Sequence, residues 1–513
     1  MTTSGLDALR RDGEHLMEEL AREYYEAQAG LRSEAHFQSV YARHPRLTSD
    51  DALEAAREAF RGAPSGSDDR RSARMMFDWV AETRVSRALA ELDEREIAWE
   101  GTAMVRLDDG ARVPYARIAI EIANAGDRGK RMALERARAA LVRSELAPLR
   151  RERFQRERDL VEALDIGPTY NGTFTELSGI DLAGLAAQCE KFLRDTQSMW
   201  DDVYRDTVRD KLGIDPREAT RADALVILRA REFDAAFPGA ALQTVVARQM
   251  ADMGIDATAG GHIIVDAEER EGKRARAFCS PVRVPWEVYL VLRPHGGQAD
   301  YRTFLHELGH ALHFGHTSAD LPFEYRWLGD NSVTESYAML CDHLLHDPGW
   351  LRRYTALGSN GSSSRGDVGA FLRASGFEEL QFLRRYCAKL LYEVTLYSGD
   401  VPWDALPDLY VESLGRATSF RYDAADAFVD VDPHFYSARY LRAWQLQALL
   451  TETLRDRFDD DWFRNPRTGP WITTELFAEG QRELADEIAA RVASRPLTFD
   501  PLVRATEALV TAS

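Results

Sequence analysis

Apolar residues recur at three- and four-residue spacing along most of the chain, which is the pattern of amphipathic helices. The stretch LDALRRDGEHLMEELAREYYEAQ, at residues 6–28, shows this spacing among arginines and glutamates. Residues 128–164 repeat it with mixed charges, which indicates solvated helix faces with local ion pairs. The hydrophobic pattern therefore predicts a mainly α protein.

Strand patterns are confined to two places. Asp109-Gly110 lies between VRL and ARVPY and predicts a short hairpin, with a loop as the alternative. HIIVD at 262–266 and VYLVL at 288–292 are β-branched and aromatic runs separated by turn residues. These runs predict one small sheet directly before residue 306.

The composition narrows the classes of protein. The chain has 513 residues, of which 45% are hydrophobic and 29% charged, which is typical of a globular protein. Its net charge of −19 argues against non-specific binding to nucleic acid or to an anionic membrane. The segment GSNGSSSRGD at 358–367 has the composition of a flexible linker.

The same composition points to the cytoplasm. The first residues have no continuous apolar core of a secretory signal, and no stretch approaches 18 uninterrupted apolar residues. The four cysteines are widely spaced and form no CxxC pair, which favours buried, reduced thiols. We therefore expect a cytoplasmic protein without a disulfide scaffold.

Candidate chemistry is concentrated in HELGHALHFGH, which begins at residue 306. His306 and His310 are four residues apart, so on a helix they project side by side, as two imidazoles must to share one tetrahedral Zn²⁺. Glu307 is offset by about 100°, close enough to act as a general base without being a ligand. Asp342, in the next helical run, is a candidate hydrogen-bond partner for a zinc-bound imidazole, an exposed helix charge being the alternative.

A third ligand is needed, and three residues compete for the role. His316 stands where metzincins place their third histidine, but the helix-breaking glycine of that class is displaced here by two residues. Glu335 lies in a second helical run and is the favoured ligand. Its alternative is a capping box with Ser332, in which the carboxylate only reaches back to the start of the helix. Glu324 is the third candidate.

Several stretches together resemble one family. HELGHALH followed by Glu335 is similar to the thimet oligopeptidase and oligopeptidase F family of zinc metallopeptidases, which are gluzincins. ARAFCSPVRVPWEVYLVL at 275–292 resembles the sheet before the zinc helix of that family, and PHFY at 433–436 resembles its late catalytic segment. The closing stretch at 462–492 resembles the family's last helices.

The resemblance implies a two-lobed, mainly α metallopeptidase fold that encloses a deep channel, with one small β-sheet next to the zinc helix. It is specific over residues 166–513, the expected catalytic domain, whereas residues 1–165 are expected to form an N-terminal helical region of the same body. Such enzymes cleave short, unstructured peptides, so short peptides are the expected partners. The oligomeric state stays open.

By the same resemblance, one Zn²⁺ per chain is bound by His306, His310 and Glu335, and Glu307 activates water. Two alternatives to this endopeptidase remain: a zinc carboxypeptidase with a similar helix, and a non-catalytic relative that only binds peptides. The intact Glu307 speaks against the second alternative.

The resemblance also implies that His434, in PHFY, donates a hydrogen bond to the substrate or to the developing oxyanion. Where the family has tyrosines three residues apart, this chain has Arg439 and Arg442. Tyr440 is the favoured phenolic donor, and Tyr436 or either arginine is the alternative.

Overall fold

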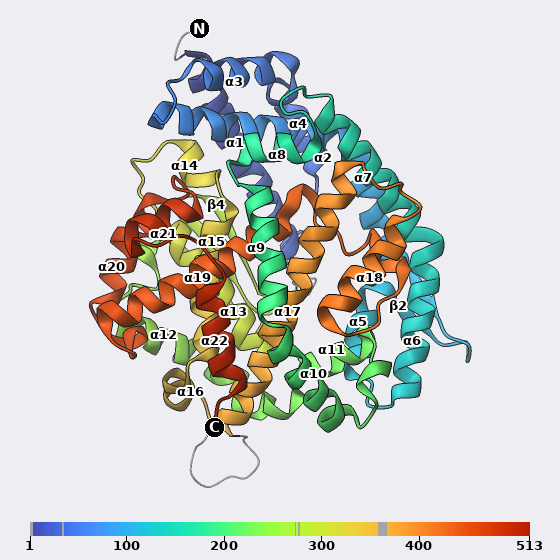
Figure 1. Cartoon of the computed structure of the whole chain (residues 1–513). Coiled ribbons are helices and arrows are strands. Elements are labelled where there is room, and N and C mark those ends of the chain that lie inside the picture. The colour runs from blue at the N-terminus through green and yellow to red at the C-terminus, as the bar shows by residue number, and fades with distance from the viewer. Residues whose placement is uncertain (1–3, 33–34, 272, 275–276, 358–366) are drawn as a thin grey trace. The chain divides into compact units, whose positions relative to one another are not determined.

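The computed structural model describes residues 4–32, 35–271, 273–274, 277–357 and 367–513. Most of these residues are helical, and the strands form only two small sheets (Figure 1), which confirms the mainly α class. All but the last residue of the expected linker at 358–367 lie outside the described residues. No helix in the described part of the chain is both long and apolar enough to span a bilayer.

The chain divides into two compact units, each assembled from separated segments. Unit 1 contains residues 1–84, 231–372 and 442–502, and unit 2 contains residues 85–230, 373–441 and 503–513. Both units draw on segments from either side of residue 165, and the division expected there stays a prediction.

Unit 1 carries the zinc-motif sequence. Its helices are α1 (Ser4–Gln28), α2 (Phe37–Arg43), α3 (Asp50–Gly62), α12 (Leu242–Met253), α13 (Gln298–His316), α14 (Phe323–Trp327), α15 (Asn331–Asp342), α16 (Pro348–Tyr354), α20 (Thr468–Glu475) and α21 (Ala485–Ala493).

Unit 2 contains α5 (Tyr115–Asn124), α6 (Arg128–Leu141), α7 (Ala147–Glu162), α8 (Tyr170–Ser178), α9 (Leu182–Asp195), α10 (Gln197–Leu212), α11 (Arg221–Arg229) and α18 (Leu406–Thr418). Four further helices contribute residues to both units, namely α4 (Asp68–Thr102), α17 (Val368–Ser398), α19 (Tyr436–Phe458) and α22 (Asp500–Val510).

The sheet expected before residue 306 is present in unit 1. It has the order β3 (Ile263–Asp266), β5 (Glu287–Val291) and β4 (Phe278–Arg283), in which β3 is parallel and β4 antiparallel to β5. Helix α1 packs on this sheet, and the Tyr25 ring stacks on Tyr289 with centroids 3.7 Å apart. Helix α13 packs against β4 and β5, so the sheet supports the helix that carries the zinc motif.

The hairpin expected around Asp109-Gly110 is present in unit 2. Strands β1 (Met104–Arg106) and β2 (Arg112–Pro114) pair in antiparallel register. Gly110 has a φ of 86°, a left-handed conformation that glycine adopts without a steric cost. The Asp109 carboxylate accepts a hydrogen bond of 2.9 Å from the Ala111 N–H, which closes the turn.

A buried arginine holds three helices of unit 2 together. Arg384 of α17 is only 1% exposed. Its guanidinium donates to the Leu193 carbonyl at 2.9 Å and the Ala417 carbonyl at 2.6 Å, near the carboxyl ends of α9 and α18. Helix carboxyl ends carry partial negative charge, so these two ends compensate the buried cation.

Glu324 of α14 is a buried carboxylate of unit 1 that forms an ion pair. Its side chain is fully buried, and the Nη2 atom of Arg10, on α1, lies 2.7 Å from its Oε1 atom. The Ser72 hydroxyl, on α4, donates to the same oxygen. Glu324 therefore joins three helices, and this candidate for the third ligand has a structural role.

We expect Glu324→Gln to lower the free energy of unfolding by about 3 kcal/mol, because it leaves the partly buried Arg10 cation without its main partner. Urea unfolding followed by circular dichroism measures the change. Glu54→Gln on α3 is the control, since that carboxylate is 55% exposed. Equal unfolding midpoints for the two variants would contradict the structural role of Glu324.

Candidate metal centre

The candidate centre is built on two helices that approach each other closely. Leu305 and Leu308 of α13 are buried, as are Tyr337 and Leu340 of α15, and the two helices pack against each other. At the crossing, a Cβ added to Gly309 would lie 2.5 Å from the Cα of Ala338. The glycine of HELGH therefore permits the approach that brings α15 to the two histidines of α13.

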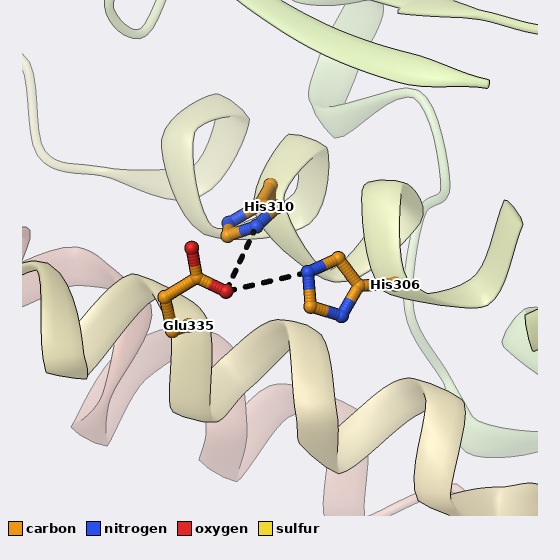
Figure 2. A group of neighbouring side chains, drawn as sticks. All are labelled: His306, His310 and Glu335. Carbon is orange, nitrogen blue, oxygen red and sulfur yellow. Dashed lines mark ion pairs between the residues drawn. The ribbon is translucent and has the colours of Figure 1, made fainter. Parts of the chain in front are cut away.

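The structure brings His306, His310 and Glu335 together (Figure 2). The Nε2 atoms of His306 and His310 lie 3.3 Å and 3.8 Å from the Oε2 atom of Glu335. One ligand atom from each of the three residues lies within 4.8 Å of the other two. Two imidazoles and a carboxylate in this arrangement suit one tetrahedral metal ion.

Each imidazole is held from behind by a side chain of α15. The Nδ1 atom of His306 lies 2.9 Å from Asp342 Oδ2, and the Nδ1 atom of His310 lies 2.8 Å from Thr334 Oγ1. Such partners orient the rings and leave the two Nε2 atoms directed at the centre. Asp342 was a candidate from the sequence, whereas Thr334 was missed, although it directly precedes Glu335.

Without a metal, the two histidines differ in protonation. Burial lowers the pKa of His306, but its hydrogen bonds to Asp342 and Glu335 outweigh burial and raise that pKa to about 10. Burial lowers the pKa of His310 to about 4. A proton on His306 thus occupies the space between this ring and Glu335, and a metal ion must displace it.

Glu307 is oriented by the sheet. Its Oε2 atom accepts a hydrogen bond of 2.9 Å from the backbone N–H of Cys279, on β4. Burial and the Glu307 charge raise the pKa of the Cys279 thiol well above its usual range, so this thiol stays protonated. Glu307 follows His306 directly on α13 and is not part of the group formed by His306, His310 and Glu335.

The other two histidines near the carboxyl end of α13 make different contacts. His316, the last residue of α13, has its Nε2 atom 3.2 Å from the Asp256 carbonyl. His313 is fully buried, with its Nε2 atom 3.1 Å from the Gly480 carbonyl, and burial lowers its pKa to about 3. His313 is therefore a neutral core histidine.

The capping-box interpretation of Glu335 is wrong. The N-cap of α15 is Asp330, whose carboxylate accepts a hydrogen bond of 2.9 Å from the Ser332 N–H. Ser332 therefore lies inside the helix, and Glu335 lies two residues beyond Val333, the position from which a side chain reaches back to the cap.

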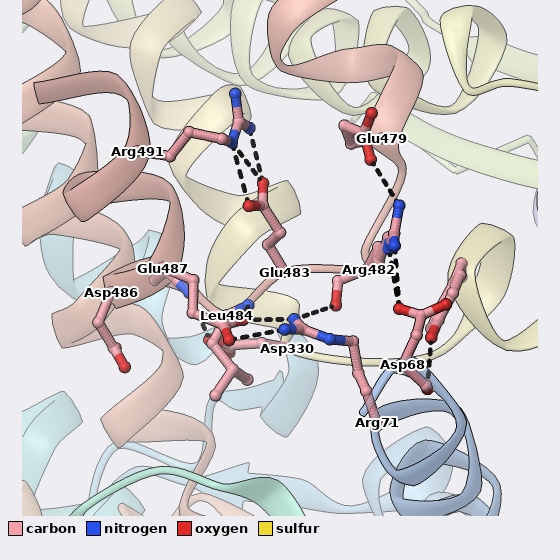
Figure 3. A network of polar contacts seen from close by, with 12 residues as sticks. Asp68, Arg71, Asp330, Glu479, Arg482, Glu483, Leu484, Asp486, Glu487 and Arg491 are labelled. Atoms are coloured by element: carbon pink, nitrogen blue, oxygen red, sulfur yellow. Dashed lines mark hydrogen bonds and ion pairs between the residues drawn. The ribbon is translucent and has the colours of Figure 1, made fainter. Parts of the chain in front are cut away.

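Asp330 also anchors the start of α15 in a polar network (Figure 3). Its Oδ2 atom lies 3.3 Å from the Arg442 guanidinium and 3.3 Å from the Ala485 N–H. Arg442 also pairs with Asp486. Arg442, an alternative donor to the oxyanion, is thus engaged by two carboxylates. Figure 3 also shows three further ion pairs of this network: Arg71–Glu487, Arg482–Asp68 and Arg491–Glu483.

His434 and Tyr440 belong to unit 2, whereas the three clustered residues belong to unit 1. His434 lies in the turn Pro433–Phe435, at a φ of 51°. The Tyr440 ring packs at 5.0 Å from the Tyr436 ring, measured between centroids. The Arg439 guanidinium lies 6.0 Å from a phenylalanine ring of α8. The roles expected for these residues stay predictions.

Comparison with known proteins shows a shared fold. No protein-family model and no curated protein sequence matches the chain. Among solved structures, the chain is similar to the carboxypeptidase of Pyrococcus furiosus, in a form described as apo-Mg, with a TM-score of 0.63 and 12% sequence identity. The match covers 99% of each chain. At this identity, the likeness shows that the two chains share a fold.

We expect Gly309→Ala to weaken metal binding by at least about tenfold, because the new methyl group must push α15, and with it Glu335, away from α13. Competition with a chromogenic zinc chelator measures the affinity. Gly101→Ala in α4 is the matched control, since its added Cβ meets no atom within 4 Å. Equal zinc affinity in both variants would show that α15 tolerates the shift.

Metal analysis separates the two carboxylates that competed as third ligand. After dialysis against a weak chelator, we expect wild type and Glu324→Gln to retain zinc, and Glu335→Gln to lose most of it. Retention of zinc by Glu335→Gln, or its loss by Glu324→Gln, would overturn the assignment.

Proposed function

We propose that this chain is a zinc-dependent metallopeptidase that hydrolyses peptide bonds in short, unstructured peptides. The observation that carries the proposal is the convergence of His306, His310 and Glu335, with Glu307 next to His306 on α13. A donor set of two imidazoles and one carboxylate fits Zn²⁺, and three protein ligands leave a coordination position for chemistry. Asp342 and Thr334 behind the imidazoles support the same assignment.

When bound, zinc supplies Lewis acidity, which polarises a carbonyl and brings the pKa of water close to about 7. Glu307 then accepts a proton from the attacking water and returns it to the leaving amine, as a general base followed by a general acid. The hydrogen bond from the Cys279 N–H fixes the orientation of this carboxylate. A fixed proton acceptor needs no reorganisation during the reaction.

The position of β4 supports the proposed preference for unstructured substrates. This strand lies at one end of the strand order β3-β5-β4 and contacts Glu307 through its backbone. An extended peptide can add to such an edge as a further strand, through main-chain hydrogen bonds. Binding through the backbone favours segments without secondary structure and tolerates many side chains.

We assign to His434 and Tyr440 the role of hydrogen-bond donors to the carbonyl oxygen as it gains negative charge. The assignment rests on the resemblance of PHFY to the late catalytic segment of the thimet oligopeptidase and oligopeptidase F family. Tyr436 and Arg439 are the alternatives. The engagement of Arg442 by Asp330 and Asp486 makes it the weakest of the proposed donors.

A carboxypeptidase is the second candidate function, because the chain shares its fold with the Pyrococcus furiosus carboxypeptidase. An exopeptidase must bind the free C-terminal carboxylate, for which arginine is well suited. The metal chemistry is the same for both candidates, so the discriminating feature is the need for a free chain end. In either case, we propose a cytoplasmic enzyme of short peptides.

The test compares wild type with Glu307→Gln on internally quenched peptides with blocked or free C-termini. We expect about one zinc per chain in both proteins, internal cleavage by wild type, and a loss of kcat of at least about 100-fold in the variant. Cleavage restricted to peptides with free C-termini would favour the carboxypeptidase. Equal activity of the two proteins would remove Glu307 from the mechanism.

A further inference from the structure

The turn that carries His434 is strained. His434 and Phe435 have φ values of 51° and 50°, so two consecutive residues with a Cβ atom occupy the left-handed region. Such residues are unfavourable in this region, and the conformation persists only where its surroundings enforce it. Contacts around the turn must therefore hold His434 and Phe435 in this conformation.

Phe435 anchors the turn in the interior of unit 2. Its side chain is fully buried, and its ring lies 5.0 Å from Phe174, 5.1 Å from Tyr397 and 5.7 Å from Tyr170, measured between centroids. Tyr170 and Tyr397 are themselves stacked at 4.0 Å. The aromatic cluster from α8 and α17 therefore fixes the residue next to His434.

One buried carboxylate holds both ends of the turn. Glu393 of α17 accepts a hydrogen bond of 2.8 Å from the Asp432 N–H through one oxygen. Its other oxygen accepts from the Ser437 hydroxyl. The backbone before and after His434 is thus tied to the same side chain, so the turn has little freedom to relax its strain.

A second buried carboxylate faces the imidazole. Glu157 of α7 is fully buried, and its Oε1 atom lies 3.6 Å from Nδ1 of His434. The same oxygen accepts a hydrogen bond of 2.5 Å from the Tyr170 hydroxyl, and Oε2 pairs at 2.5 Å with Arg153. Burial and the Glu157 charge raise the pKa of the Tyr170 phenol well above its usual range, so the phenol keeps its proton. Tyr170 therefore donates to Glu157 and leaves Glu157 as the acceptor that faces His434.

We propose that Glu157 is a positioning residue for His434, which holds the ring with a proton on Nδ1 and leaves Nε2 for the substrate. The two groups lie within ion-pair distance, and an ionised carboxylate only accepts hydrogen bonds, so the pairing favours the tautomer with a proton on Nδ1. The His434 side chain is 24% exposed, so the ring is not sealed in the interior. This inference rests on the proposed function, in which His434 acts on the substrate.

The arrangement explains how His434 could donate to an oxyanion. With Nδ1–H directed at Glu157, a hydrogen bond from Nε2 requires the doubly protonated ring, which carries a positive charge. A carboxylate at ion-pair distance offsets that charge in a partly buried site. Glu157 would thereby orient the His434 ring and stabilise a positive charge on it.

The first test is spectroscopic and needs no peptidase activity. Zinc-loaded protein with ¹⁵N-labelled histidine is examined by NMR, and the His434 signals are assigned by their loss in His434→Asn. We expect a protonated Nδ1 in wild type and a shift of that proton towards Nε2 in Glu157→Gln. A bare Nδ1 in wild type, or identical signals in the two proteins, would overturn the proposal.

The second test is kinetic. We expect Glu157→Gln to keep its zinc and its KM within about twofold while kcat falls about tenfold or more, and Glu157→Asp to recover part of the loss. Tyr170→Phe is the control, because it removes a hydrogen bond from Glu157 and keeps the charge that faces His434. It should therefore retain the protonated Nδ1.

The outcomes separate the two proposals. If wild type shows the protonated Nδ1 but cleaves no peptide, the proposed function fails and the pairing of Glu157 with His434 stands. If wild type cleaves peptides and Glu157→Gln alters neither the NMR signals nor kcat, the positioning role fails alone. If Glu157→Gln does not fold, the wild-type spectrum and Glu157→Asp still decide.

Discussion

The candidate centre depends on the close approach of α13 and α15. Three donor groups must come within a few ångströms of one point, yet two are on one helix and the third is on another. The backbone of α15 reaches that distance because residue 309 has no side chain. The same helix then supplies the metal-directed Glu335 together with Asp342 and Thr334 behind the imidazoles, so one packing contact determines five side-chain positions.

Buried ion pairs connect the helices around the candidate centre. Nearly all basic residues of this acidic chain are arginines, and several are paired with carboxylates inside the units rather than on the surface. Asp330 with Arg442 anchors the start of α15, and Glu324 with Arg10 joins α14 to α1. Removing one partner from a buried pair leaves an uncompensated charge, so a substitution that breaks either pair is expected to be destabilising.

The local features of this protein were predictable from its sequence because their causes are local. Helical periodicity, the Asp109-Gly110 hairpin and the β-branched runs before residue 306 depend on neighbours within a few residues. The pairing of His306 with His310 depends only on the pitch of one helix. The sequence did not choose in the same way between Glu335, His316 and Glu324 as the third ligand. Which of them reaches the metal depends on the path of the chain between His310 and that residue.

The sequence by itself determined the helical class, the small sheet and the two imidazoles of α13, because spacing along one element specifies each of them. Only the tertiary structure decided that Glu335 is brought to those imidazoles, that Glu324 is buried against Arg10, and that Glu157 faces His434. Glu157 and His434 are 277 positions apart, and no local pattern records such a pair. The two side chains come together only when the helices and turns of unit 2 pack against one another.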